Sequence, residues 1–284
     1  MAIQTTKNNT LEQNDHVLYQ VDELGTATVT LNNPEKHNAF DDVIIAKLTE
    51  IFNDIKQRAD IKVVVLASTG KSFSAGANLN WMKRMASYTY EENLKDANAL
   101  ANMLHALNFL PQPTIAKMQG NAFGGAVGLA ACCDIVIAAE RVKFTLSEVK
   151  LGLIPATISP YVINAMGARA CRRYFATAEL FNASKAQALG LVSEVVSDEE
   201  LDNKVSEMIT TLNNNGPEAV RAAKQLVFDV ADKEINQALL TDTSERIAAI
   251  RVSKQGQEGL SAFFEKRPAN WTDNKTSQKT NSED

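Results

Sequence analysis

Two short glycine-containing segments are the parts of this chain whose residue types and spacing could hold developing negative charge. They are Phe73–Leu79, which reads FSAGANL, and Gly120–Ala126, which reads GNAFGGA. Each follows an expected strand and precedes an expected helix, an arrangement that leaves backbone N–H groups unpaired and directed at a ligand. Two such turns predict an oxyanion hole, in which preorganised donors stabilise the charge that forms on a carbonyl oxygen.

The glycines of these segments also have a plainer interpretation as residues of tight turns. For an isolated pair such as Gly124-Gly125 that interpretation is the better one. The other turn, at Gly76, makes the oxyanion-hole interpretation the better one, because two small-residue turns in the same strand-to-helix context can supply a pair of donors.

Glu148 is the candidate acid or base. It lies between apolar positions in Thr145–Pro155, just after an expected strand. Burial in an apolar pocket raises the pKa of a carboxyl group, which lets it exchange a proton with a carbon acid near neutral pH. The alternative is a glutamate that caps a helix or forms a salt bridge.

Other kinds of chemistry have little support. The histidines lie in separate segments without an acidic or cysteine partner at ligand spacing, so no metal site is expected. Ser74 lacks the nucleophile-elbow pattern of serine hydrolases. The cysteines are odd in number and have no CxxC spacing, which argues against disulfides or zinc and favours a reducing compartment. The residues concerned are His16, His37 and His105, and Cys132, Cys133 and Cys171.

Hydrophobic periodicity indicates an α/β core up to about residue 200. Strands are expected at 26–31, 63–67, 114–118, 135–137 and 142–144, and helices over 44–55, 79–110 and 127–131. Asp41 or Asp42 would cap the first helix, and Pro111 and Pro113 would stop the long one.

The remainder is expected to be helical, with Pro217 at a helix start. Buried helix faces are predicted at Leu226, Val230, Ile235 and Leu239.

Charge and composition narrow the partners. The chain has 284 residues and a formal net charge of −5, which makes nucleic acid or an anionic membrane surface a poor partner. No export or import signal and no membrane-spanning run is evident, so a cytoplasmic protein is expected. The segments 1–15 and 272–284 are polar and expected to be disordered.

Once these elements are placed, the chain closely resembles the crotonase superfamily, the enoyl-CoA hydratases and isomerases. The matching segments are residues 33–40, 73–79, 120–131 with Cys133-Asp134-Ile135, 144–155 and 261–267. The resemblance implies a spiral of ββα units over 16–200 and a helical trimerisation region over 201–271. It also implies a homo-oligomer, either a trimer or a dimer of trimers.

The resemblance assigns roles to individual residues. The N–H groups of Ala77 and Gly125 would form the oxyanion hole, and Glu148 would be the catalytic carboxylate. The CoA portion of an acyl-CoA substrate would meet an N-terminal loop and the C-terminal tail, and no separate cofactor is implied. The CoA-binding positions are Lys36, His37, Ala39, Ala75, Phe263 and Lys266. Without the resemblance, the two lysines are ordinary surface charges.

The chain departs from the family pattern at two positions. Two-carboxylate hydratases carry their other glutamate three residues after the second N–H donor, where this chain has Gly128. Glycine can act neither as acid nor as base. Asn78 is a milder departure, because relatives commonly have aspartate there.

Three functions remain open. One carboxylate suits a Δ3-Δ2-enoyl-CoA isomerase, in which a single base moves a proton from C2 to C4. The segments 73–84 and 152–162, which include Ile158-Ser159-Pro160, instead resemble methylglutaconyl-CoA hydratases of leucine catabolism. We therefore favour a hydratase of a branched enoyl-CoA. The third is a CoA- or RNA-binding scaffold without catalysis, and the acidic balance argues against RNA. Trp81, Met82 and Met85 are interpreted as helix core, with pocket lining as the alternative.

Overall fold

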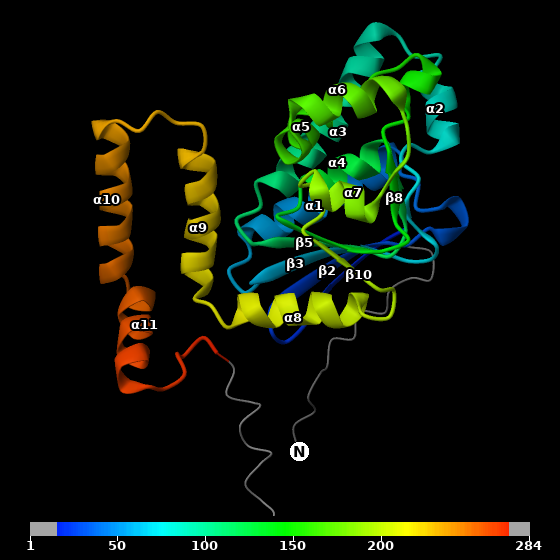
Figure 1. Cartoon of the computed structure of the whole chain (residues 1–284). Coiled ribbons are helices and arrows are strands. Elements are labelled where there is room, and N and C mark those ends of the chain that lie inside the picture. Colours follow the sequence, from blue (N-terminus) through cyan, green and yellow to red (C-terminus); the bar gives the residue numbers. More distant parts are fainter. Residues whose placement is uncertain (1–15, 273–284) are drawn as a thin grey trace, which may run out of the picture.

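A six-stranded sheet forms the centre of the computed structural model, which describes residues 16–272 (Figure 1). The segments expected to be disordered, 1–15 and 272–284, lie outside this range apart from Thr272. The strands, in spatial order, are β1 (Val17–Val21), β2 (Thr26–Leu31), β3 (Val63–Ser68), β5 (Thr114–Met118), β7 (Ile135–Ala139) and β10 (Glu194–Val196).

All neighbours in this sheet run parallel except β1 and β2. The first five residues of β3 are all buried, as its continuous apolar run predicts for a strand covered on both faces. Helix α1 (Asp42–Gln57) packs on β1 and on α3, whereas α8 (Leu201–Asn213) contacts β3, β5 and β7. The sheet therefore lies between helical layers, with α8 along the opposite side from α1 (Figure 1).

A second, four-stranded sheet carries the two glycine turns. Its order is β4 (Ser72–Ser74), β6 (Asn121–Phe123), β8 (Lys143–Thr145) and β9 (Phe181–Asn182). The first three strands are parallel to one another. Because the carboxyl ends of neighbouring parallel strands meet at one edge, the segments that follow β4, β6 and β8 come together there.

The single helix expected over 79–110 is two helices, α2 (Leu79–Met85) and α3 (Tyr90–Asn108). A capping box explains the break: the Thr89 hydroxyl accepts a hydrogen bond from Glu92 N, and the Glu92 carboxylate accepts one from Thr89 N. Trp81 is buried and donates through Nε1 to Asp96 on α3, while Met82 and Met85 are half-buried.

The remaining core helices are short. They are the 3₁₀ turns η1 (Pro34–Lys36) and η2 (Glu148–Leu151), and α4 (Gly125–Ala131), α5 (Ser159–Met166), α6 (Ala168–Thr177) and α7 (Ala183–Ala188). None of the helices within residues 16–272 is long and apolar enough to cross a membrane.

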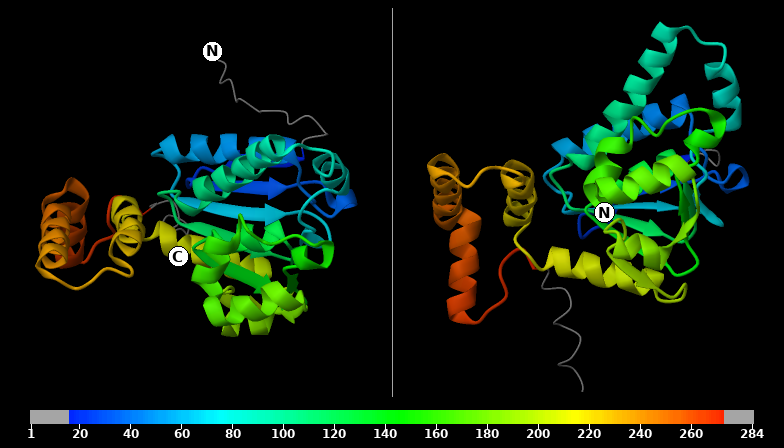
Figure 2. Two further views of the ribbon diagram at one scale, coloured as in Figure 1. Left: turned by 90° about the horizontal axis from the view of Figure 1, so that it is seen from above. Right: turned by 45° about the horizontal axis from the view of Figure 1, so that its top comes forward.

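Three C-terminal helices, which we call the C-terminal arm, project away from the core (Figures 1 and 2). They are α9 (Pro217–Val230), α10 (Gln237–Val252) and α11 (Lys254–Glu265). Pro217 begins α9 as expected. The predicted burial of Leu226, Val230, Ile235 and Leu239 is wrong for a single chain: the first, second and fourth are half-buried, and Ile235 is 82% exposed. Leu226, Val230 and Leu239 are helical as predicted, whereas Ile235 lies in the connection between α9 and α10. This chain alone supplies no surface that buries these residues.

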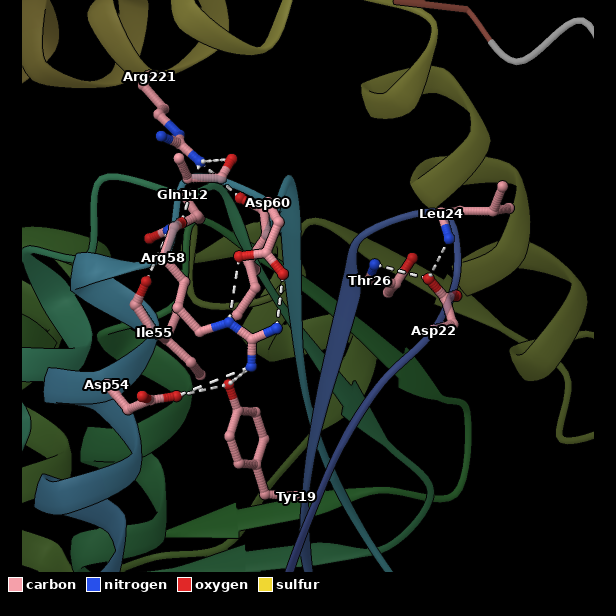
Figure 3. Close-up of polar contacts among 12 residues, drawn as sticks. Tyr19, Asp22, Leu24, Thr26, Asp54, Ile55, Arg58, Asp60, Gln112 and Arg221 are labelled. Atoms are coloured by element: carbon pink, nitrogen blue, oxygen red, sulfur yellow. Dashed lines mark hydrogen bonds and ion pairs between the residues drawn. The ribbon is translucent and has the colours of Figure 1, made fainter. Parts of the chain in front are cut away.

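Polar contacts fasten the arm to the core. Lys224 Nζ pairs with the Asp134 carboxylate at 2.6 Å and donates to the Gln112 carbonyl. Arg221 reaches from α9 toward the segment that contains Arg58 and Asp60 (Figure 3). Its guanidinium donates to the carbonyl of Ile61 at 2.6 Å. The Gln112 amide in turn donates to the carbonyls at the end of α1. The junction therefore combines charge-assisted hydrogen bonds with an aromatic contact, in which the rings of Phe228 on α9 and Phe109 after α3 lie 4.9 Å apart between centroids.

Candidate active site

The first turn, after β4, is held by a neighbouring loop. Phe40 N donates to the Gly76 carbonyl at 2.9 Å, and Asn78 N donates to the Phe40 carbonyl at 2.9 Å. This is a parallel bridge between Phe40 and Ala77, so the N–H of Ala77 points away from Phe40. Gly76 has φ +82°, and a Cβ there would lie 2.6 Å from the Phe123 carbonyl oxygen. Only glycine fits this position without strain.

The second turn, after β6, meets the first. A Cβ on Gly76 would lie 3.7 Å from Gly125 N, which places the two turns against each other. Gly124 has φ +53° and donates to the Thr145 carbonyl at 2.9 Å, and Gly125 is the first residue of α4. A Cβ on Gly125 would lie 2.6 Å from Phe40 Cζ, so the buried Phe40 ring requires glycine there.

The N–H groups of Ala77 and Gly125 are both available as donors. Neither donates a hydrogen bond to any atom of residues 16–272. Gly125 is at a helix start, where N–H groups have no partner in the preceding turn. The two small-residue segments therefore place two unpaired donors in adjoining turns, as expected from the sequence.

Glu148 follows β8, the third parallel strand, and begins η2. A Cβ on Gly124 would lie 3.1 Å from Glu148 Oε1, so the carboxylate lies directly over the residue before Gly125. Its Oε2 is buried and has no hydrogen-bond partner within the described residues. Burial raises the pKa of the Glu148 carboxyl above its usual range.

Glu148 is the first residue of η2, and a backbone hydrogen bond at Glu148 itself acts against the rise in its pKa. Within residues 16–272 it makes no ion pair, and the residue at the cap position of η2 is Ser147. A carboxylate oxygen that is buried without a hydrogen-bond partner, as Glu148 Oε2 is, is costly for folding and is typical of a functional site.

The residues assigned to CoA binding divide into two groups. Lys36, His37, Ala39 and Ala75 lie together, because the loop that contains the first three runs beside the first turn and the His37 carbonyl accepts from Ala75 N at 2.9 Å. Lys36, His37 and Ala75 are exposed, and Ala39 is buried.

Phe263 and Lys266 belong to the C-terminal arm, which stands apart from that loop in both figures (Figures 1 and 2). The single chain does not bring these two residues to the loop. Phe263 is 77% exposed, so its ring is free to contact a second molecule.

Buried polar residues that the sequence did not single out hold this loop in place. The Asn38 amide donates to the carbonyls of Thr69 and Ser72 and accepts from Asn33 N, and the Ser74 hydroxyl donates to the Asn38 carbonyl. The backbone of Asn38 is left-handed, with φ +53°. A left-handed residue is favoured by asparagine, which is the one signal available in the sequence.

Asn78, where relatives commonly have aspartate, has a structural role. Its side-chain oxygen accepts from Asn80 N at 2.9 Å and from Trp81 N at 3.4 Å, so it caps α2. Asparagine and aspartate are equivalent N-caps, and the departure leaves the turn intact.

At the other departure, Gly128, a side chain from another segment fills the space beside the backbone. A Cβ on Gly128 would lie 2.2 Å from Ile158 Cγ2 and 2.7 Å from Ile158 Cβ. Ile158 is 1% exposed and Gly128 is buried. The place where a second glutamate would begin is therefore occupied by an isoleucine from the start of α5. The described residues also contain no group of three or more metal-ligating side chains.

Comparisons with known proteins agree with this architecture. An enoyl-CoA hydratase from Shewanella pealeana superposes with a TM-score of 0.87 at 47% identity, over 91% of this chain and 97% of that one. An enoyl-CoA hydratase from Mycobacterium smegmatis gives 0.85 at 30% identity, over 90% and 99%.

Sequence comparison gives the same family. A short-chain-enoyl-CoA hydratase from Clostridium acetobutylicum is 30% identical over 243 residues, which are 85% of this chain and 92% of that protein. The family model described as enoyl-CoA hydratase/isomerase matches residues 22–274. With the α/β fold, the paired turns and these matches, the chain belongs to the enoyl-CoA hydratase/isomerase family of crotonase-type proteins.

Proposed function

We propose that the protein is an enoyl-CoA hydratase that adds water across the α,β double bond of a branched, methylglutaconyl-type enoyl-CoA. The observation that carries the proposal is the unpaired, buried Oε2 of Glu148, whose carboxylate lies over Gly124, beside two unpaired N–H groups. The segment that includes Ile158-Ser159-Pro160 supports the branched substrate through its resemblance to methylglutaconyl-CoA hydratases.

In the proposed reaction Glu148 accepts a proton from water while the water oxygen forms a bond to Cβ. The π electrons move to the thioester oxygen, which accepts hydrogen bonds from Ala77 N and Gly125 N as it becomes an enolate. The protonated Glu148 then gives the proton to Cα. A raised carboxyl pKa suits both halves of this exchange, since the group must take and return a proton near neutral pH.

The substrate would be held as a CoA thioester by the exposed loop that contains Lys36 and His37, close to Ala75. We propose no metal and no separate cofactor, because the thioester itself provides the electron sink. The units proposed for the chain are a catalytic core over 16–200 and an assembly region over 201–271.

The test is turnover by the purified protein. Incubation with 3-methylglutaconyl-CoA and, separately, crotonyl-CoA should give loss of the conjugated thioester absorbance, with faster loss for the branched substrate. Heat-denatured protein is the control. No loss with either substrate would exclude hydration, and faster loss with crotonyl-CoA would exclude the branched preference.

A Δ3-Δ2-enoyl-CoA isomerase is the second candidate, and the contact between Gly128 and Ile158 favours it. That contact leaves position 128 without a proton carrier, and isomerisation needs one base that moves a proton from C2 to C4. A 3-enoyl-CoA should then gain conjugated absorbance in the presence of the protein. No gain would eliminate this candidate.

We also propose a homo-oligomer, a trimer or a dimer of trimers, assembled through the C-terminal arm. Phe263 and Phe264 are 77% and 75% exposed, and Ile235 and Val252 of the same arm are exposed to a similar extent. Exposed apolar patches of this kind mark interaction surfaces. Light scattering after size-exclusion chromatography should give three or six chains for the intact protein and fewer after Phe263→Ser and Phe264→Ser. A monomeric intact protein would contradict the proposal.

A further inference from the structure

Two glycines four residues apart expose one side of α4 and the residue before it. They are Gly124, the residue before α4 with φ +53°, and Gly128, inside α4 about one helical turn further along. The space over Gly124 holds the Glu148 carboxylate, with Oε1 at 3.1 Å from a Cβ there. The space over Gly128 holds Ile158, with Cγ2 at 2.2 Å. Glu148 therefore lies against the residue before α4, and Ile158 lies against α4 about one turn further along the helix.

Ile158 is held firmly in this position. Its carbonyl accepts from Val162 N at 3.1 Å, so Ile158 is the N-cap residue of α5, and Pro160 follows in the first turn. Leu104 of α3 closes the other side, with Cδ2 at 3.6 Å from a Cβ on Gly128. Both side chains are almost fully buried. A β-branched side chain fixed at a helix start has few rotamers, so it cannot swing away easily.

This packing has a chemical consequence and a steric one. An isoleucine can neither accept nor donate a proton, and it leaves no polar partner for a water molecule on that side of the carboxylate. An acyl chain that extended along α4 from a Cα held near Glu148 would meet Ile158 within about one helical turn, roughly 5 Å. That is the length of a few carbon–carbon bonds.

We propose that Ile158 is a specificity-determining residue that closes the α4 side of the site to long acyl chains. By filling the volume beside Gly128, Ile158 limits acyl-CoA ligands to those with a short acyl group in this direction. It also makes this side of the site apolar. The inference rests on the proposed function in one respect only, namely that an acyl-CoA binds with its thioester at the two N–H groups.

Binding of saturated acyl-CoA thioesters tests the inference without any turnover. Isothermal titration should give tighter binding of butanoyl-CoA than of octanoyl-CoA to the unaltered protein. Ile158→Ala should shift the ratio of the two Kd values at least about 10-fold toward octanoyl-CoA, since each added methylene in an apolar pocket is worth a factor of about 10 or more. Val162→Ala, which shortens a buried residue of the same helix, is the matched control and should leave the ratio within about twofold.

An unchanged ratio in Ile158→Ala, or an equal shift in Val162→Ala, would overturn the inference. Failure of the proposed hydration is distinguishable, because it would remove turnover of enoyl-CoA while leaving these binding ratios measurable. No binding of either thioester would overturn both proposals.

A second measurement tests the contact itself. Gly128→Ala should lower Tm by roughly 5 °C, because overpacking costs on the order of 1–3 kcal/mol in a domain of this size. In the Ile158→Gly background the same substitution should lower Tm by less than half as much. Equal losses in the two backgrounds would mean that Ile158 does not fill the volume beside Gly128.

Discussion

The candidate active site and the C-terminal arm differ in which residues cover their apolar and small side chains. At the site, every close approach is made by this chain: Phe40 packs on Gly125, Ile158 fills the space over Gly128, and Gly76 abuts the turn at Phe123. In the arm, α9 and α10 have no buried residue and α11 has one, Ala262. The turns and the carboxylate are therefore packed by residues of the same chain, whereas the arm carries apolar surface that this chain leaves uncovered.

The largest expected effect concerns the chemistry of the site. Glu148→Ala should lower kcat for hydration by about 10³-fold or more, because the only proposed proton carrier is lost. Glu50→Ala, which removes an exposed glutamate of α1 paired with Lys47, should leave kcat unchanged. Steady-state kinetics with the best acyl-CoA substrate measures both. A Glu148→Ala rate within about tenfold of the original would mean that another group carries the proton.

A slightly smaller effect is expected from crowding the second turn. Gly125→Ala places a Cβ 2.6 Å from Phe40 Cζ, so the turn or the ring must move. Displacing one oxyanion donor typically costs about 10²–10³ in kcat. Ala77→Gly is the matched control, because it keeps the N–H and removes only a methyl group, and its kcat should fall by less than about tenfold. Equal losses in the two variants would argue that side-chain contacts, not donor placement, matter at these turns.

Much of this site could be predicted from the sequence because its components are local. A recognisable strand precedes each of its three parts, which are the turn at Gly76, the turn at Gly124 and the carboxylate of Glu148. Parallel neighbouring strands bring their carboxyl ends together at one edge of the sheet. The break between α2 and α3 was missed, although Thr89 and Glu92 form a capping box that the sequence contains.

Two other features depend on contacts between distant segments. Nothing near Gly128 in the sequence indicates that Ile158 lies against it, thirty positions later. In the arm, the 3.6-residue period at Leu226 and Val230 correctly predicted helix, but the period alone does not say whether the partner surface belongs to the same chain.

The junction between the two regions offers a smaller, measurable effect. Lys224 is a partly buried cation, with 10% of its side chain exposed, and it pairs with Asp134, which also accepts from Thr114 N and Oγ1. Lys224→Met should lower the free energy of unfolding by about 1–3 kcal/mol, because the partly buried Asp134 carboxylate then keeps only its hydrogen bonds from Thr114 among the described residues. Hydrogen exchange of α9 amides should become faster while that of β3 does not.

Arg246 provides the control for this junction, because its ion pairs with Asp229 and Asp242 stay within the arm. Arg246→Met should change the free energy of unfolding by less than about 1 kcal/mol. If the two variants were equally destabilised, the attachment of α9 to the core would not depend on the Lys224 pair.

The smallest expected effect contrasts the buried carboxyl of the site with an exposed one. Folding raises the pKa of Glu148 by burial, so the folded state binds that proton more tightly than the unfolded chain does. Stability from this group is present at low pH and is lost as pH rises from the ordinary carboxyl range through the raised pKa. Glu148→Gln should therefore have a higher Tm than the unaltered protein at pH 8, with the difference shrinking toward pH 4.

Glu179 should behave with the opposite sign. Its hydrogen bonds from Arg173 and then Thr177 lower its pKa to about 2, so its contribution is present at neutral pH and is lost as pH falls through the carboxyl range toward that value. Glu179→Gln should lower Tm slightly at pH 8, by less than the shift at Glu148, because this exposed pair is screened by solvent. Thermal unfolding of both variants at pH 4 and pH 8 measures the contrast. A lower Tm for Glu148→Gln at pH 8 would mean that the Glu148 carboxylate has a stabilising partner. Glu148 would then resemble Glu179, whose carboxylate stabilises the fold, and its burial would not be a cost to stability that the reaction requires.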